Sequence, residues 1–274
     1  MSDQALGNAH SAWEQARAMM TDERDGTSTA GAEIDAQITT LLREATTGGA
    51  AAGGDLGRHL VRTADGDHGT FREALDLIAA AAKEHGGADT LSYARAVHHL
   101  PAEVTAGHVV PAASRLNELL RTNPGVEAMV YTGYMLASGR GYAANPGRAR
   151  AMMQAAADAG SAAALFELYV YDATGFTGAV DTEAAISHLH QAAKLGNARA
   201  MANLAGAYAT GRGLPRDASK ALTWYLRAAE AGNVRAACRL SHMYGTGQGV
   251  DLNDAKSERY AQRAHTLARQ PLEV

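Results

Sequence analysis

Acidic and histidine side chains gather in one short segment of the chain, residues 63–70, which has the sequence TADGDHGT. Asp65, Asp67 and His68 are residue types that hold metal ions or move protons when they converge. The segment departs from the calcium-loop pattern, which needs further oxygen ligands and a glutamate at fixed offsets. We therefore interpret it as a solvated turn and keep a metal site as the alternative.

Other candidate groups for chemistry are a pair of histidines and one cysteine. His188 and His190 are two residues apart, so a helix turns them to different faces and one shared metal ion is disfavoured. Cys238 is the single cysteine, which excludes an intramolecular disulfide, and no catalytic base stands close to it in sequence. We find no nucleophile–base motif, metal signature or cofactor fingerprint. The sequence therefore predicts no cofactor and favours a role other than catalysis, with enzymatic activity left open.

A Gly-Arg-Gly triplet at residues 211–213, within YATGRGLPRDASKALTWYLRAAEAGN, is a candidate phosphate-binding loop. Gly-x-Gly occurs in phosphate-binding loops, where it follows a strand and is accompanied by Lys-Ser/Thr or by an acidic partner. Neither companion is present here. A tight turn between two helices is the favoured interpretation.

The composition favours helices over strands as the elements that carry these residues. Of the 274 residues, 46% are apolar and only 5% aromatic, with 29 glycines. This mixture suits closely packed helices better than a β-sandwich, which would need more Val, Ile, Thr and aromatic side chains. The start of the chain has no signal-peptide pattern, and the longest apolar run, residues 77–82, is too short to span a membrane. We expect a soluble cytoplasmic protein with no membrane partner.

The charge is unevenly distributed along the chain. The net charge is -4 in total, yet residues 197–270 contain 11 Lys and Arg against 5 Asp and Glu. Residues 1–196 contain 14 Lys and Arg against 23 Asp and Glu. The C-terminal end is therefore a basic pole on an acidic body, and the total disfavours a nucleic-acid partner.

The glycine turn recurs every 36 residues, which shows an internal repeat. The positions that stay in phase are Gly139, Gly175, Gly211 and Gly247; Gly141, Gly213 and Gly249; Ala128, Ala164, Ala200 and Ala236; and Ala156, Ala192, Ala228 and Ala264. Four units run from about 128 to 270 without insertion or deletion. One such unit cannot bury its apolar face alone, whereas a stack of them can.

Helix-terminating and helix-capping residues stand at fixed places in each unit. Gly160, Gly196 and Gly232 lie where a helix is expected to end, because glycine takes the left-handed conformation there at little cost. Asn and Asp, with one Ser, occupy the expected N-cap positions, which are Asn145, Ser161, Asp181, Asn197, Asp217, Asn233 and Asn253. Each unit is therefore predicted to be a helix, a glycine-rich turn, a second helix and a short turn. His188 falls in the position of Trp224 and Tyr260, which favours a packing role for it.

In these positions the chain resembles the Sel1-like repeat family, a relative of tetratricopeptide repeats. The pattern is clear in AMANLAGAYATGRGLPRDASKALTWYLRAAEAGN (200–233), and it is degenerate at 164–197, where TGFTGAV replaces the glycine turn. The resemblance covers about half of the chain. It implies an all-α fold, an α-solenoid of stacked helix-turn-helix repeats, and a role as an interaction scaffold.

Upstream of residue 128 the period blurs while helical signals continue. We predict N-terminal helices at about 4–20 and 31–45, with a linker-like tract at 46–54. Residues 55–127 are predicted to form diverged repeats, 128–270 the four Sel1-like repeats, and 271–274 a tail.

If the first helices line the concave side, as in tetratricopeptide-like stacks, their residues not used for packing face a groove. Those residues are Glu127, Tyr131, Tyr134, Phe166, Glu167, Val170, Arg199, Asn203, Arg235, Arg239 and His242. The groove would change from aromatic and aliphatic to cationic along the stack, with Arg199, Arg235 and Arg239 forming one patch. Because the arginine fork binds carboxylates at two points, an acidic peptide or a free C-terminal carboxylate is the expected ligand.

The favoured function is thus a scaffold or adaptor that binds a protein or peptide partner in the concave groove. One alternative is an enzyme, or the essential accessory of one, with its site in the N-terminal half or the groove. The other is nucleic-acid binding through the basic C-terminal end, which would show steep salt dependence. The sequence does not identify the partner or the oligomeric state.

Overall fold

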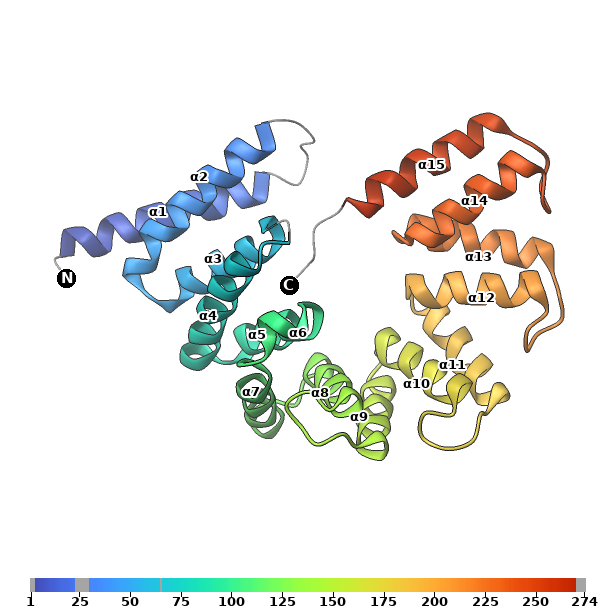
Figure 1. Ribbon diagram of the computed structural model, residues 1–274, viewed down its shortest axis with the longest axis horizontal. Helices are drawn as coiled ribbons and strands as arrows, with labels where there is room; N and C mark the ends of the chain where they lie inside the picture. Colours follow the sequence, from blue (N-terminus) through green and yellow to red (C-terminus); the bar gives the residue numbers. More distant parts are fainter. Residues whose placement is uncertain (1–2, 23–29, 65, 270–274) are drawn as a thin grey trace. The chain divides into compact units, whose positions relative to one another are not determined.

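The computed structural model describes residues 3–22, 30–64 and 66–269, and these ranges contain helices and no strand. The helices follow one another as adjacent pairs joined by short turns (Figure 1). The predicted all-α solenoid of helix pairs is therefore confirmed. The described part of the chain divides into two compact units, with residues up to Ala144 in the first and residues 145–269 in the second.

The first unit contains eight α-helices and one 3₁₀ turn in its described part. They are α1 (Asp3–Asp22), α2 (Ala30–Ala45), η2 (Thr46–Gly48), α3 (Ala50–Thr63), α4 (His68–His85), α5 (Gly87–His99), α6 (Ala102–Thr105), α7 (Val109–Thr122) and α8 (Val126–Ser138). The second unit contains α9 (Pro146–Asp158), α10 (Ala162–Thr174), α11 (Thr182–Lys194), α12 (Ala198–Thr210), α13 (Ala218–Glu230), α14 (Val234–Thr246) and α15 (Asp254–Ala268). The helices expected near 4–20 and 31–45 are present as α1 and α2.

The glycine-rich tract at 46–54 is part of the packed structure, which corrects its interpretation as linker-like. After the turn η2, α3 already begins at Ala50. A Cβ atom added at Gly54 would lie 2.8 Å from the Cβ of Ala81, and one added at Gly57 would lie 2.7 Å from the carbonyl oxygen of Ala74. These glycines therefore let the backbones of α3 and α4 approach closely, which a composition argument cannot distinguish from flexibility.

Polar side chains also hold the first unit together. The indole nitrogen of Trp13 donates to Asp55 at 2.7 Å, and the guanidinium of Arg58 reaches both Asp55 and Asp89 at 2.6 Å. Asp67 caps α4 by accepting hydrogen bonds from the backbone and the hydroxyl of Thr70. The helix-capping role of Asp67 thus agrees with the interpretation of residues 63–70 as a turn. Asp65 lies outside the described residues.

The second unit follows the repeat pattern closely. Every predicted N-cap from Asn145 to Asn253 accepts a hydrogen bond from the backbone N–H three residues further on. Gly175, Gly211 and Gly247 take left-handed conformations at the ends of α10, α12 and α14, with φ of 70°, 78° and 69°. Positive φ at these turns is what glycine supplies without strain. The sequence prediction of the turns is confirmed.

Successive repeats are joined by small residues and by two bridging asparagines. Ala164, Ala200, Ala236 and Leu204 are fully buried, so the first helices approach closely. The amide of Asn197 donates to the carbonyl of Ala162, and Asn233 makes the equivalent bond to Ala198 one repeat later. Each of these asparagines therefore caps its own helix and ties that helix to the preceding repeat.

One pair of positions, sixteen residues apart, differs between the repeats. Tyr244 and Tyr260 stack there with ring centroids 5.9 Å apart, whereas the degenerate repeat has Asp172 and His188 in the same places. The Nδ1 atom of His188 lies 2.8 Å from Asp172, so His188 forms a hydrogen bond in the position where the last repeat packs the ring of Tyr260. The packing position of His188 was predicted correctly, but its polar partner was not.

Candidate partner-binding site

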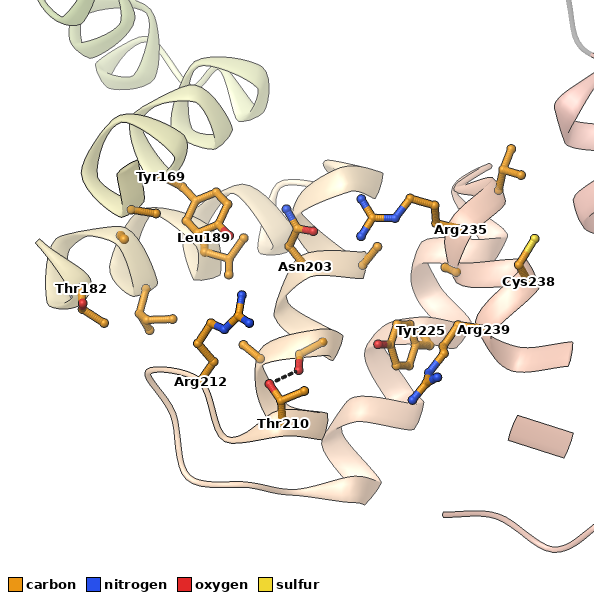
Figure 2. A pocket seen from close by; sticks show the side chains of 18 of the residues that line it. Tyr169, Thr182, Leu189, Asn203, Thr210, Arg212, Tyr225, Arg235, Cys238 and Arg239 are labelled. Carbon is orange, nitrogen blue, oxygen red and sulfur yellow. Dashed lines mark hydrogen bonds between the residues drawn. The ribbon is translucent and has the colours of Figure 1, made fainter. Parts of the chain in front are cut away.

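A cavity of about 700 Å³ lies in the second unit, lined by residues of α10, α11, α12, α13 and α14 and of the turn after α12. Figure 2 shows its side chains at close range. The first helices α12 and α14 supply most of its polar groups, and the second helices α11 and α13 supply apolar ones. A cavity of this size accommodates several side chains of a bound partner.

The inner wall of the cavity is apolar and built from small and aliphatic residues. Ile186 and Leu189 come from α11, and Ala202, Gly206 and Ala207 come from α12. Short side chains on α12 leave the space into which the cavity extends. Apolar side chains of a ligand would be removed from water here, at a gain of roughly 25 cal/mol per Å² of apolar surface.

Three arginines stand around this wall, and none of the described lining residues is acidic. Arg212 and Arg235 are exposed, and Arg239 is half-buried on α14. Within the described part of the chain, no carboxylate forms an ion pair with any of the three. Guanidinium groups held beside an apolar surface without a counter-charge attract carboxylates, which they bind at two points.

Further polar groups complete the cavity. Asn203 is half-buried on α12, and its side-chain amide has no hydrogen-bond partner among the described residues. His242 and Cys238 are exposed on α14 and border the same space. The cavity thus has charged and neutral hydrogen-bond donors next to an apolar wall.

Four of the residues predicted to face the groove line this cavity, namely Asn203, Arg235, Arg239 and His242. They lie on neighbouring first helices, as the repeat register required. The structure brings these four together, whereas the remaining predicted residues lie elsewhere.

Phe166, predicted as a free groove residue, is instead part of the core of the second unit and only 3% exposed. The guanidinium carbon of Arg199 lies 4.5 Å from the centre of its ring, and Arg199 Nη1 lies 3.9 Å from a carboxylate oxygen of Glu167. Val170 is half-buried against the same core. Arg199 is therefore engaged within its own repeat stack, and it is not among the arginines that line the cavity.

Tyr131 and Tyr134 belong to the first unit, where they form an aromatic cluster with His98. The rings of His98 and Tyr134 stack with centroids 4.4 Å apart, and Arg95 Nε donates to the hydroxyl of Tyr131 at 3.1 Å. The side chain of Arg95 also reaches Glu127. These predicted residues thus make contacts with α5 in their own unit.

Sequence reasoning missed Arg212 and Tyr169 as cavity residues. Arg212 is the middle residue of the Gly-Arg-Gly turn. The prediction for this turn concerned the backbone of its two glycines and not the side chain of Arg212. A signal was available in the first repeat, since Arg140 occupies the same position 72 residues earlier. Its guanidinium donates to the carbonyl of His98 and to Thr105, so in that turn too the arginine reaches back to earlier helices.

The histidines of the second unit take separate partners. His190 lies beside the hydroxyl of Tyr208 at 3.5 Å, while His188 bonds Asp172. The two side chains accordingly diverge, as their spacing predicted. Among the described residues, no group of three or more His, Cys, Asp or Glu side chains could hold a metal ion.

Comparison with a family model identifies the repeats. The Sel1 repeat model matches residues 126–161, 163–197, 198–233 and 234–264, which together make up about half of the chain. No curated protein matches the chain.

Solved structures with the same fold include two that cover most of the chain. A Sel1 repeat protein from Oxalobacter formigenes is 25% identical, with a TM-score of 0.61 over 82% of this chain and 94% of that one. A protective antigen of uropathogenic Escherichia coli with an SLR fold is 20% identical, with a TM-score of 0.51. That alignment covers 95% of this chain and 54% of the antigen, so this chain spans about half the length of the antigen.

None of the helices within the described ranges is long and apolar enough to cross a bilayer.

Proposed function

Because this chain belongs to the Sel1 repeat family, we propose that it binds a peptide or protein partner in the cavity lined by α10 to α14. Repeats of this family generally mediate protein–protein interaction. The observation that carries the proposal for this chain is the set of three arginines without counter-charge, beside an apolar wall with no acidic residue among its described members.

The chemistry of the cavity favours an acidic partner. Arg235 and Arg239 are one helical turn apart on α14, and their side chains extend in different directions (Figure 2), so each guanidinium can bind a carboxylate of the partner. An acidic peptide segment or a free C-terminal carboxylate meets this requirement. Apolar side chains of the same ligand would occupy the space between Leu189 and Gly206.

The other predicted residues lie outside the cavity and are proposed as separate contact residues. Arg199 and Glu167 are held as a pair on neighbouring first helices, and Val170 lies one turn further along α10 than Phe166. Tyr131 and Tyr134 are candidate contacts on the first unit. Their contribution is separate from that of the cavity.

A displayed peptide library tests the proposal although the natural partner is unidentified. The purified full chain is used to select from random twelve-residue peptides, in parallel with the double variant Arg235→Ala/Arg239→Ala. We expect the unchanged chain to enrich peptides that combine Asp or Glu with apolar residues. The double variant should bind the enriched peptides more weakly by about 2 kcal/mol, as expected when desolvated charge contacts are lost.

A matched control separates loss of binding from loss of folding. Arg216→Ala and Arg227→Ala remove two arginines that do not line the cavity. This second double variant should keep the affinity of the unchanged chain. Selection of no peptides, or selection of the same peptides with equal affinity by the Arg235/Arg239 variant, would contradict the proposal.

A further inference from the structure

The three arginines of the cavity are not gathered at one point. We propose that the site binds an internal, extended segment of a partner that has acidic side chains at both ends and apolar side chains between them. This inference rests on the proposed function and specifies its ligand. It decides between an acidic segment and a free C-terminal carboxylate in favour of the segment.

The placement of the arginines along the helices carries the inference. Arg212 follows the C-terminal end of α12, which closes at Thr210, whereas Arg235 lies in the first turn of α14, which begins at Val234. As first helices of successive repeats, α12 and α14 run in the same direction. Arg212 and Arg235 therefore lie at opposite ends of this helical layer, and Arg239 lies one turn further along α14 than Arg235.

The distance between the two ends suits a short extended chain. α12 has 13 residues, which correspond to about 20 Å of helix. An extended chain covers about 3.3 Å per residue, so roughly six residues cross this length, and fewer are needed because arginine side chains reach inward. One terminal carboxylate would reach the cation at one end and leave the other without a partner.

Asn203 supports a ligand that has a peptide backbone. It lies between Arg212 and Arg235 in the view of Figure 2. Its side-chain amide carries both a donor and an acceptor and has no hydrogen-bond partner within the described part of the chain. An extended peptide presents N–H and C=O groups that match this pair. Ala202, Gly206 and Ala207 on the same helix keep the approach to α12 open.

Four eight-residue peptides, all N-acetylated and C-amidated, serve as probes in calorimetric titrations with the full chain. EDALFADE is acidic at both ends, EDALFANQ and QNALFADE at one end each, and QNALFANQ at neither. A fifth probe is QNALFANQ with a free C-terminal carboxylate. We expect EDALFADE to bind about tenfold tighter than either one-ended peptide, because each end adds charge-assisted contacts.

Two variants show which acidic end of the peptide each group of arginines contacts. Arg212→Gln should weaken one of the one-ended peptides by about fivefold or more and leave the other nearly unchanged, while the double variant Arg235→Gln/Arg239→Gln should show the reverse pattern. Asn203→Ala should weaken all peptides alike, since every one of them has the same backbone. Arg216→Gln, in the same turn as Arg212 but outside the cavity, is the matched control and should change nothing.

Several results would overturn the inference. They are equal binding of EDALFADE and of the peptide with the free carboxylate, weakening of the same one-ended peptide by both arginine variants, and absence of binding by all five probes. The proposed function is judged separately, by the peptides selected from the library. If library peptides bind in an Arg235- and Arg239-dependent manner but lack acidic residues at two ends, the cavity is a partner site of a different specificity.

Discussion

The guanidinium of Arg150 on α9 lies 2.6 Å from the carboxylate of Asp172 on α10, and Asp172 is only 5% exposed. The Nδ1 atom of His188 on α11 lies 2.8 Å from the other carboxylate oxygen of Asp172. A buried carboxylate is thus shared by three consecutive helices at the repeat that departs most from the family pattern. Removing one partner from such a pair leaves a buried charge without compensation, which costs more than the pair itself contributes.

We expect Asp172→Ala to lower the free energy of unfolding by about 1–3 kcal/mol, because the partly exposed Arg150 and His188 lose the hydrogen bonds to their shared partner. The double change Asp172→Tyr/His188→Trp copies the Tyr208–Trp224 pair of the next repeat. It should recover most of that loss, since well-packed apolar residues replace buried ion pairs at little cost. Urea unfolding followed by circular dichroism measures both variants. A double variant as unstable as Asp172→Ala would show that the polar group is required for the fold.

Close packing of α3 on α4 gives a second prediction. A Cβ at Gly57 would lie 2.6 Å from Cγ1 of Ile78, so Gly57→Ala should destabilise the first unit by about 1–3 kcal/mol. Gly53 is the matched control, because its Cβ would lie 3.5 Å from Leu77, an ordinary contact. Gly53→Ala should leave stability unchanged or raise it by up to about 1 kcal/mol through helix propensity. Equal effects of the two changes in thermal unfolding would contradict the close contact.

Two histidines with lowered pKa values make stability depend on pH. Burial lowers the pKa of His59, which lies against Asp35 and Thr39 of α2. Burial, with the charges of His99 and Arg140, lowers the pKa of His98 to about 4. Both side chains are neutral when folded at neutral pH, whereas in the unfolded chain they bind protons near pH 6.5.

The unfolded state therefore binds more protons between these lowered values and about 6.5, and stability falls as the pH drops through this window. The stabilisation is complete above about pH 7, and one histidine contributes a slope of at most about 1.4 kcal/mol per pH unit between its lowered pKa and 6.5. Urea unfolding at pH 7.5, 6 and 5 measures the slope. His59→Gln should reduce it, and equal stability at all three pH values would contradict the lowered pKa values of both histidines.

The repeat period predicted much of the second unit from sequence. Caps such as Asn197 and turns such as Gly211 depend on local rules, so their roles follow from residue type and phase alone. The first unit was less predictable, because Gly54 and Gly57 serve contacts with residues of α4 that lie 17 to 27 positions away in sequence.

The candidate site was predictable only in part, for a physical reason. Register predicts Asn203, Arg235 and Arg239 on one face, and all three line the cavity. Side chains at equivalent positions nevertheless take different partners, and Arg199 stacks on Phe166 because that ring is present only in the preceding repeat. Arg212 was missed because the direction of a turn side chain depends on the left-handed glycines around it.

The glycine turn gives a further prediction. Gly211 has φ of 78°, which a β-branched residue adopts only with strain, so Gly211→Val should destabilise by about 1 kcal/mol or more. Gly178→Ala, in an exposed turn with nothing near the added Cβ, should stay within about 0.5 kcal/mol. Differential scanning calorimetry measures both. Unchanged melting of Gly211→Val, together with loss of binding to a nucleotide, would show that this turn is a phosphate loop.

Photo-crosslinking tests the location of the partner site most directly. A library-selected peptide is synthesised with benzoylphenylalanine in place of its central apolar residue, bound to the full chain, irradiated and mapped by mass spectrometry. We expect crosslinks to the cavity wall, at residues such as Leu189, Gly206 and Tyr225, and their loss when unlabelled peptide competes. Crosslinks confined to residues 1–144 or to α15 would contradict it and place the partner elsewhere on the chain.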